Sequence, residues 1–228
     1  MFASNPHQRL PSRVGPEALT RLAERARPVS ASRTQLLPVI PPLADLLPER
    51  ALRRGSTVLI AADEAGGATT LALALVSAAS TAGSWCVAVG LPDIGALAAN
   101  ELSLDLAKLA FVPWPGSRLA DAAATLIGGV DLVVLRPPPH MRAVLSRRLV
   151  ARSRDRRAVL IVVDPASSWP ERADVELRVQ NARWMTMEPG GQCLRQRLVS
   201  VTATGRGSAD QHKRRELWLP AESRLIET

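Results

Sequence analysis

Residues 58–75, VLIAADEAGGATTLALAL, contain the pattern that decides the fold. An uninterrupted apolar run ends in a short turn with two adjacent glycines, and a stretch rich in alanine and leucine follows. We predict a buried strand over residues 56–61, a turn over residues 62–67, and a helix over residues 68–82 that ends at Gly83. An apolar strand followed directly by a helix is typical of a parallel sheet covered by helices on both faces.

The same alternation of strand and helix continues along the chain. Further apolar strands are predicted at residues 85–89, 109–112, 130–135 and 158–163. Helices are predicted at residues 94–106, 118–127 and 140–152. Three later strands have no helix between them, and they are predicted at residues 174–179, 183–187 and 193–202, with a turn at 189–191. The predicted fold class is therefore α/β, with a mostly parallel sheet flanked by helices and antiparallel edge strands near the C-terminus.

Composition divides the chain into a core and two flanking segments. Residues 1–44 are rich in proline, arginine and serine, and we predict one N-terminal helix at residues 16–25 and an extended linker at 28–42. Residues 45–202 form the predicted core. Residues 203–228 are polar and charged, which predicts a flexible tail, although residues 217–219 are an apolar island within it.

Length and charge limit the classes of partner. The 228 residues suffice for one large domain, and 46% of them are hydrophobic, as in a globular protein. The formal charge of +8 favours nucleic acid or an acidic protein as a partner. Nearly all the positive residues are arginines, and only Lys108 and Lys213 are lysines, a bias that GC-rich coding also produces. Charge alone is therefore weak support for DNA binding.

The cysteines and the apolar runs indicate neither a metal site nor a membrane span. Cys86 and Cys193 are too few for a disulfide framework and lack the paired C-x-x-C spacing of a metal site. No apolar run reaches the roughly 18 residues of a membrane helix, and residues 1–14 lack the apolar core of a signal peptide. We expect a cytoplasmic protein with no metal and no membrane partner.

The turn after the first strand resembles a phosphate-binding loop that has lost its lysine. Such a loop reads G-x-x-x-x-G-K-[ST] between a strand and a helix. Gly67 and Thr69 match the second glycine and the hydroxyl residue, but Ala62 replaces the first glycine and Ala68 replaces the lysine. Alanine supplies no charge for the β- and γ-phosphates. The degenerate loop consists of Ala62, Gly66, Gly67, Ala68, Thr69 and Thr70.

The acidic residue that would help to hold magnesium is missing as well. In phosphate-loop enzymes a second strand, the Walker B strand, ends in an aspartate that binds the metal. Here the strand at residues 131–135 ends in Arg136, and a cation there repels magnesium. We therefore predict no catalytic residues and no nucleotide cofactor. The alternative is a divergent ATPase that uses Arg54 or Arg136 in place of the lysine.

In these residues the chain resembles the RecA recombinase core. Residues 47–62 resemble the segment that leads into the RecA phosphate loop, and residues 63–75 resemble the loop and its helix. Residues 102–113, followed by 116–134, resemble the stretch through the Walker B strand, and the whole resemblance covers residues 45–165. Among RecA relatives, a short, degenerate and arginine-rich chain resembles the ImuA family, especially its ImuA-prime branch. Asp93 follows the second core strand, where RecA has its catalytic glutamate, and is also a plain helix N-cap before Ile94.

This resemblance implies a role in DNA repair. ImuA proteins are induced by DNA damage in the SOS response and belong to a mutasome for translesion synthesis. The implied partner is an ImuB-like, inactive homologue of Y-family polymerases, and through it an error-prone replicative-type polymerase. Two alternatives stay open: a SulA-like cell-division inhibitor, and a divergent ATP-binding, RecA-like protein that binds DNA.

Arginines and tryptophans supply the candidate binding surfaces. The segment 136–157 is a candidate surface for DNA phosphates or for an acidic partner segment, or else a solvated helix face. Tryptophans in loops at strand ends and in the apolar island are candidate partner contacts, and the alternative for the loop tryptophans is that each covers the edge of the core. The candidate residues are Arg142, Arg147, Arg148, Arg152, Arg154, Arg156, Arg157, Trp114, Trp169 and Trp218. Residues 16–42 are a further candidate docking segment, for the chain's own domain, for a partner or for a second copy of the chain.

Overall fold

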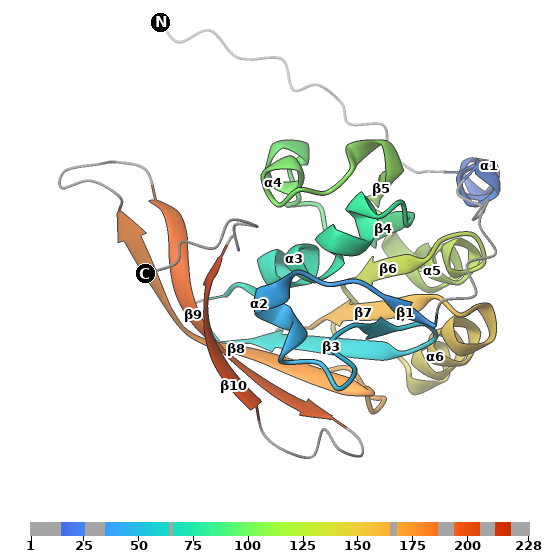
Figure 1. Ribbon diagram of the computed structural model, residues 1–228. Helices are drawn as coiled ribbons and strands as arrows, with labels where there is room; N and C mark the ends of the chain where they lie inside the picture. The colour runs from blue at the N-terminus through green and yellow to red at the C-terminus, as the bar shows by residue number, and fades with distance from the viewer. Residues whose placement is uncertain are drawn as a thin grey trace, which may run out of the picture.

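The computed structural model describes residues 15–25, 35–63, 66–164, 168–186, 194–205 and 213–219. An eight-stranded sheet runs through the molecule in the order β10-β9-β8-β3-β7-β6-β4-β5 (Figure 1). Its strands are β3 (Thr57–Ala62), β4 (Cys86–Val89), β5 (Leu109–Val112), β6 (Leu132–Leu135), β7 (Val159–Val163), β8 (Val175–Thr186), β9 (Leu194–Gly205) and β10 (Lys213–Leu219). A separate two-stranded sheet pairs β1 (Leu36–Leu37) with β2 (Leu52–Arg53).

Six neighbouring strands are parallel, and the last two add antiparallel pairs. Strand β3 lies between β7 and β8 and runs parallel to both, with Val58 opposite Ile161 and Val175. Strands β3, β4, β6 and β7 are buried at every position, as expected for strands covered on both faces. The pairs β8–β9 and β9–β10 are antiparallel. The predicted α/β class, with a mostly parallel sheet, flanking helices and antiparallel strands near the C-terminus, is confirmed.

Helices cover both faces of the parallel part of the sheet (Figure 1). Alternate residues of the strands contribute to two separate hydrophobic clusters, one on each face. One cluster contains side chains of α2 (Pro41–Ala44), α3 (Ala68–Thr81) and α4 (Ala96–Glu101). The other contains side chains of α1 (Pro16–Arg25), α5 (Leu119–Ile127) and α6 (Ala143–Arg156). No helix in the described ranges combines the length and the apolar character that a membrane crossing requires.

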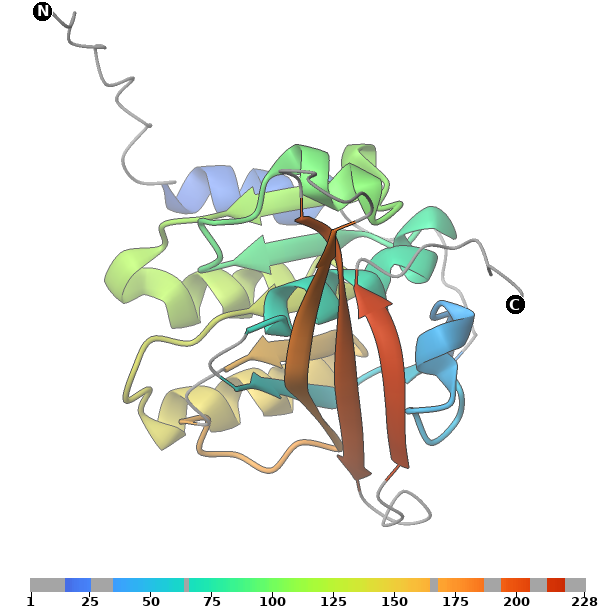
Figure 2. The ribbon, with the colours of Figure 1, turned by 90° about the vertical axis from the view of Figure 1, so that its left-hand side faces the viewer.

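The C-terminal part of the sheet corrects the prediction of a flexible tail over residues 203–228. Strand β9 continues to Gly205, and β10 pairs with it from Lys213 to Leu219, facing the viewer in Figure 2. Leu217 and Leu219 are buried against the sheet. The apolar island therefore ends an edge strand, with Leu217 and Leu219 on the buried face and Trp218 on the exposed one. Residues 206–212 and 220–228 of the predicted tail lie outside the described residues.

Other boundaries differ where tertiary contacts override local pattern. The strands predicted at 174–179 and 183–187 are one strand, β8, with a bulge between Gln180 and Arg183. The helix predicted at 94–106 is shorter, because α4 ends at Glu101 and a 3-10 turn follows at Leu106–Lys108. Part of the predicted linker forms β1 and the start of α2. The turn predicted at 189–191 lies outside the described residues.

Candidate functional site

The degenerate phosphate loop lies between β3 and α3, where glycines give it its shape. Gly66 and Gly67 have φ angles of 74° and 112°, a region that favours glycine. Gly67 is the N-cap of α3, and its carbonyl accepts a hydrogen bond from the Leu71 N–H at 2.9 Å. The amide of Gly66 donates to the Asp63 carbonyl at 3.0 Å. The strand and the helix that the sequence predicted on either side of this turn are thus present.

Strand β8 binds both the backbone and the side chain of Asp63, the first acidic residue of the loop. Its amide donates to the Val179 carbonyl at 3.1 Å, and its carboxylate accepts a hydrogen bond from the Asn181 N–H at 2.9 Å. Asn181 has a φ of 55° and lies in the β8 bulge, which brings its amide to this carboxylate. The bulge therefore holds one of the two acidic residues of the loop. The other, Glu64, lies outside the described residues.

The two alanines of the motif are part of the core. Ala62 and Ala68 are 7% and 5% exposed and belong to the same hydrophobic cluster. A methyl group therefore fills the position where a phosphate loop carries its lysine.

Arg136 follows β6 and reaches the first turn of α3. Its guanidinium donates to the Thr69 hydroxyl at 2.8 Å and forms an ion pair with the Asp93 carboxylate at 3.4 Å. In a magnesium-dependent phosphate loop, the metal is held between this hydroxyl residue and the acid of the Walker B strand. The contact between Arg136 and Thr69 thus puts a guanidinium where that metal would bind.

A second arginine, Arg197 of β9, also reaches α3, and the sequence analysis missed it. Its guanidinium donates to the Thr70 hydroxyl at 2.9 Å. Its carbon Cζ would lie 3.3 Å from a β-carbon on Gly67. Arg197 is 9% exposed, and burial lowers the pKa of its guanidinium, which nevertheless stays charged at neutral pH. The only signal in the sequence is an arginine at a position of β9 that alternates with buried Val199 and Val201.

The two arginines line a cleft of about 430 Å³ beside the loop. Thr69 and Thr70 lie on its α3 side, and Asp93 and Glu101 belong to the segment around α4 that closes the other side. The cleft thus joins the predicted loop residues to Arg136 and adds Arg197. It is a polar site with fixed hydrogen-bond donors, and it contains no lysine.

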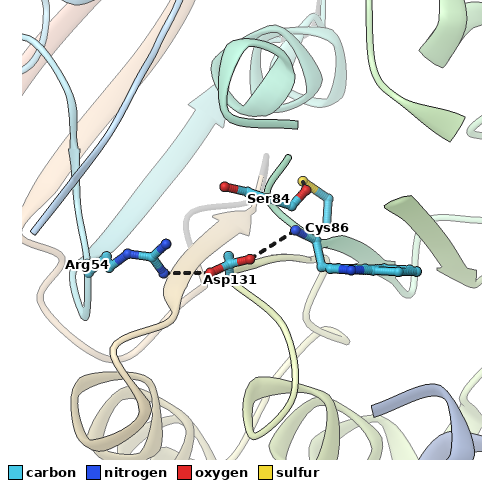
Figure 3. Close-up of polar contacts among 5 residues, drawn as sticks. Arg54, Ser84, Cys86 and Asp131 are labelled. Carbon is cyan, nitrogen blue, oxygen red and sulfur yellow. Dashed lines mark hydrogen bonds and ion pairs between the residues drawn. The ribbon is translucent and has the colours of Figure 1, made fainter. Parts of the chain in front are cut away.

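Arg54 is not near the loop, which corrects one of the two expectations for a replacement cation. It precedes β3, whereas the loop follows β3, so it lies at the opposite end of the strand. Its guanidinium donates to the Asp131 carboxylate at 2.6 Å, and the other oxygen of Asp131 accepts the Trp85 N–H at 2.9 Å (Figure 3). Burial, followed by the negative charge of Asp131, raises the pKa of the nearby Cys86 thiol to about 12. This cluster joins the starts of several strands and belongs to the structural core.

The arginines of the segment 136–157 are less available than their number suggests. Besides Arg136, four of them form ion pairs: Arg147 with Glu171, Arg148 with Asp121, Arg154 with Asp174, and Arg156 with Asp155, at 3.1, 3.4, 3.7 and 3.4 Å. Arg142 and Arg157 are the exposed residues that flank α6, and Arg152 is half-buried. The paired carboxylates offset much of the positive charge that a DNA surface would need.

The three candidate tryptophans have different environments. Trp114 is 65% exposed and follows β5, and Trp218 is 42% exposed on β10, so both are accessible to a partner. Trp169 is 7% exposed and packs in a core cluster, which corrects the interpretation of this residue as a surface contact. The Asp164 carboxylate accepts a hydrogen bond from the backbone N–H of Trp169.

Comparisons with known proteins identify a family. Residues 45–171, more than half of the chain, match the model of the MT3502 N-terminal domain. A Mycobacterium tuberculosis protein named "Uncharacterized protein Rv3395c" is 44% identical over 102 residues, which are 43% of this chain and 48% of the relative. The match therefore spans about half the length of that relative. By the extent of the family match, the chain belongs to the MT3502 N-terminal domain family.

Proposed function

We propose that this chain is a RecA-like pseudo-ATPase that works as a non-catalytic adaptor in a DNA-damage mutagenesis complex. Its proposed partner is an ImuB-like, inactive homologue of Y-family polymerases, and through that protein an error-prone replicative-type polymerase. The observation that carries the non-catalytic part is the 2.8 Å contact between the Arg136 guanidinium and the Thr69 hydroxyl. The adaptor role rests on the resemblance of residues 45–165 to the ImuA family.

The chemistry of phosphoryl transfer explains why this contact argues against hydrolysis. Catalysis in phosphate-loop enzymes depends on a lysine at the β- and γ-phosphates and on magnesium, held by a hydroxyl and an acid. Here the lysine position is buried Ala68, and a permanent cation already occupies the Thr69 hydroxyl. Magnesium would have to displace that guanidinium and bind next to its charge. Both electrostatic supports of the transition state are therefore absent from this site.

The topology supports the RecA-like part of the proposal. The loop follows central strand β3, and Arg136 follows β6, which is separated from β3 only by β7. These strands are parallel, so their C-terminal ends meet at one edge of the sheet, where open α/β proteins bind ligands. The loop after β3 and Arg136 after β6 thus lie at the same edge of the sheet, as the interpretation of Arg136 as the Walker B position requires.

Two measurements on the full chain test the proposal. Co-expression with an ImuB-like protein should give a stable complex that co-purifies through gel filtration. ATP turnover, with magnesium and with or without DNA, should stay at the background of a Thr69→Ala variant. Absence of a complex between two folded proteins would refute the adaptor role, whereas turnover that Thr69→Ala abolishes would refute the pseudo-ATPase.

One observation supports a second candidate, a divergent ATP-binding protein. Arg197 brings a cation to the loop from another strand, so the loss of the lysine does not leave the cleft without positive charge. This candidate predicts ATP binding in the presence of magnesium that weakens strongly in an Arg197→Gln variant. Calorimetry of ATP binding to the unchanged chain and to the Arg197→Gln variant distinguishes this candidate from the pseudo-ATPase, which predicts no magnesium-dependent binding.

A further inference from the structure

The cleft beside α3 is lined by basic, hydroxyl and aliphatic side chains. Arg136 and Arg197 contribute the positive charge, next to the hydroxyls of α3. Leu73, Ile94 and Leu102 also line it; Ile94 is half-buried, whereas Leu73 and Leu102 are 4% and 6% exposed. A cleft of about 430 Å³ can admit a few side chains but not a folded domain. Its ligand should therefore carry a negative charge next to an apolar group.

Arg136 already binds a carboxylate, but weakly. Asp93 lies 3.4 Å from its guanidinium, and the Asp93 side chain is 81% exposed. Such an exposed pair contributes little to stability, so another carboxylate can replace it at low cost. The Arg136 Nε atom is buried and has no hydrogen-bond partner among the described residues, so an incoming carboxylate would meet the guanidinium at Nη1, the nitrogen that now faces Asp93. A hydrogen bond from a charged guanidinium to a carboxylate is stronger than one between neutral groups.

The charges around the cleft favour one carboxylate over a polyphosphate. Asp93 and Glu101 line the cleft together with the two arginines. A polyphosphate would bring several negative charges close to those two acids, and no lysine is present to offset them. A single carboxylate can bind Arg136 in place of Asp93 without adding a large excess of negative charge. Ile94, which is half-buried at the cleft, would then contact the apolar neighbour of that acid in the ligand.

We propose that this cleft binds an acidic side chain, flanked by an aliphatic residue, from a segment of a partner protein. The proposal rests on the proposed adaptor function and specifies the chemistry of the contact. In it, Arg136, the residue that we propose to disable the ATPase, binds the carboxylate, and the half-buried Ile94 contacts the aliphatic neighbour.

The first test uses a defined probe on the full chain. The blocked peptide acetyl-Leu-Asp-Leu-amide is titrated while the NMR signal of the Arg136 Nε–H group is followed, with the Leu-Asn-Leu peptide as the charge control. We expect the Asp peptide to shift this signal and to bind at least ten times more tightly than the Asn peptide. Pyrophosphate without metal is the second ligand. Binding of pyrophosphate alone, or of neither ligand, would overturn the proposal.

The second test uses the complex with the ImuB-like protein. Arg136→Gln should weaken the complex at least tenfold by calorimetry, whereas Arg53→Gln should leave its affinity unchanged. Arg53 is the matched control because it is an exposed arginine in an ion pair with Glu49, on β2, next to Arg54 at the opposite end of β3 from the loop. An Arg136→Gln complex of normal affinity overturns the docking site and leaves the adaptor role intact. If no complex forms at all, the adaptor role fails, and the peptide titration still decides the chemistry of the cleft.

Discussion

Replacement of Asp131 tests whether its buried ion pair with Arg54, at the starts of β6 and β3, is a main source of stability. Asp131 binds two groups at once, the Arg54 guanidinium at 2.6 Å and the Trp85 N–H at 2.9 Å. The side chains of Arg54 and Asp131 are 14% and 6% exposed, so solvent screens the pair little. Asp131→Ala would leave a buried cation without its counter-ion and a backbone donor without an acceptor.

The magnitude follows from what remains buried after the substitution. Removal of one partner of a buried ion pair costs about 3–5 kcal/mol, most of which is the desolvation of the stranded charge. We expect Asp131→Ala to lower the free energy of unfolding by that amount. Asp131→Asn keeps an oxygen for the Trp85 N–H and should cost about 2 kcal/mol. Arg54→Met combined with Asp131→Asn should cost less than the sum of the single changes, by about 1–3 kcal/mol.

Urea unfolding followed by tryptophan fluorescence and circular dichroism measures these differences, provided that the slope with denaturant is unchanged. The control is Asp121→Ala, which breaks the 3.4 Å pair with Arg148 on the surface, where the two side chains are 68% and 59% exposed. Its cost should not exceed about 1 kcal/mol. If Asp131→Ala costs no more than Asp121→Ala, or if the double substitution is simply additive, the reasoning from burial is refuted.

Three further predictions concern the loop, the buried thiol and the tryptophans. Gly67→Ala should lower the free energy of unfolding by about 1–3 kcal/mol, because φ is 112° and the new β-carbon would lie 3.2 Å from a valine side chain. The control is Gly95→Ala, where the new β-carbon would have no atom within 4 Å. Equal unfolding midpoints for the two variants would contradict the argument. Since the pKa of Cys86 is raised from 9.0 to about 12, its thiolate at pH 8 should be about a thousandfold scarcer than that of an ordinary thiol. Alkylation by iodoacetamide, with the second cysteine replaced by serine, should therefore require unfolding, and rapid labelling of the native protein would show that the thiol is accessible. Trp169→Ala should lower the free energy of unfolding by about 3–5 kcal/mol, and Trp114→Ala by less than about 0.5 kcal/mol, as measured by urea unfolding. Similar losses for the two variants would contradict the difference in burial between 7% and 65% exposed.

The sequence predicted those elements whose signal is local. Strands β3 and β7 are uninterrupted apolar runs of five or six residues, which few other structures accommodate. Strand β10 gave no such signal, because its three apolar residues, 217–219, follow four charged ones and its pairing with β9 defines the rest. Strands β1 and β2 have two residues each and exist only through their mutual pairing. Where pairing rather than periodicity defines a strand, one sequence does not contain enough information.

The candidate site divides in the same way. The motif predicted the shape of the loop and the proximity of Arg136, because both depend on residues next to the ends of two strands. The position of Arg197 depends instead on the register of β9 against β8, more than a hundred residues after the loop. The expectation for Arg54 failed for a simple reason of direction: a residue that precedes β3 cannot reach a loop that follows it.

The loop therefore has a different set of side-chain contacts, and not only missing residues. A phosphate loop without lysine or magnesium would leave the hydroxyls at the start of α3 dependent on water or ligand. Here two guanidinium groups, from β9 and from the end of β6, donate to Thr70 and Thr69. A ligand that needs those hydroxyls must displace two charged donors, which is the reason why our proposal includes no magnesium nucleotide. A ligand that binds Arg136 in place of Asp93 displaces only an exposed carboxylate, and for this reason we propose an acidic side chain for this cleft.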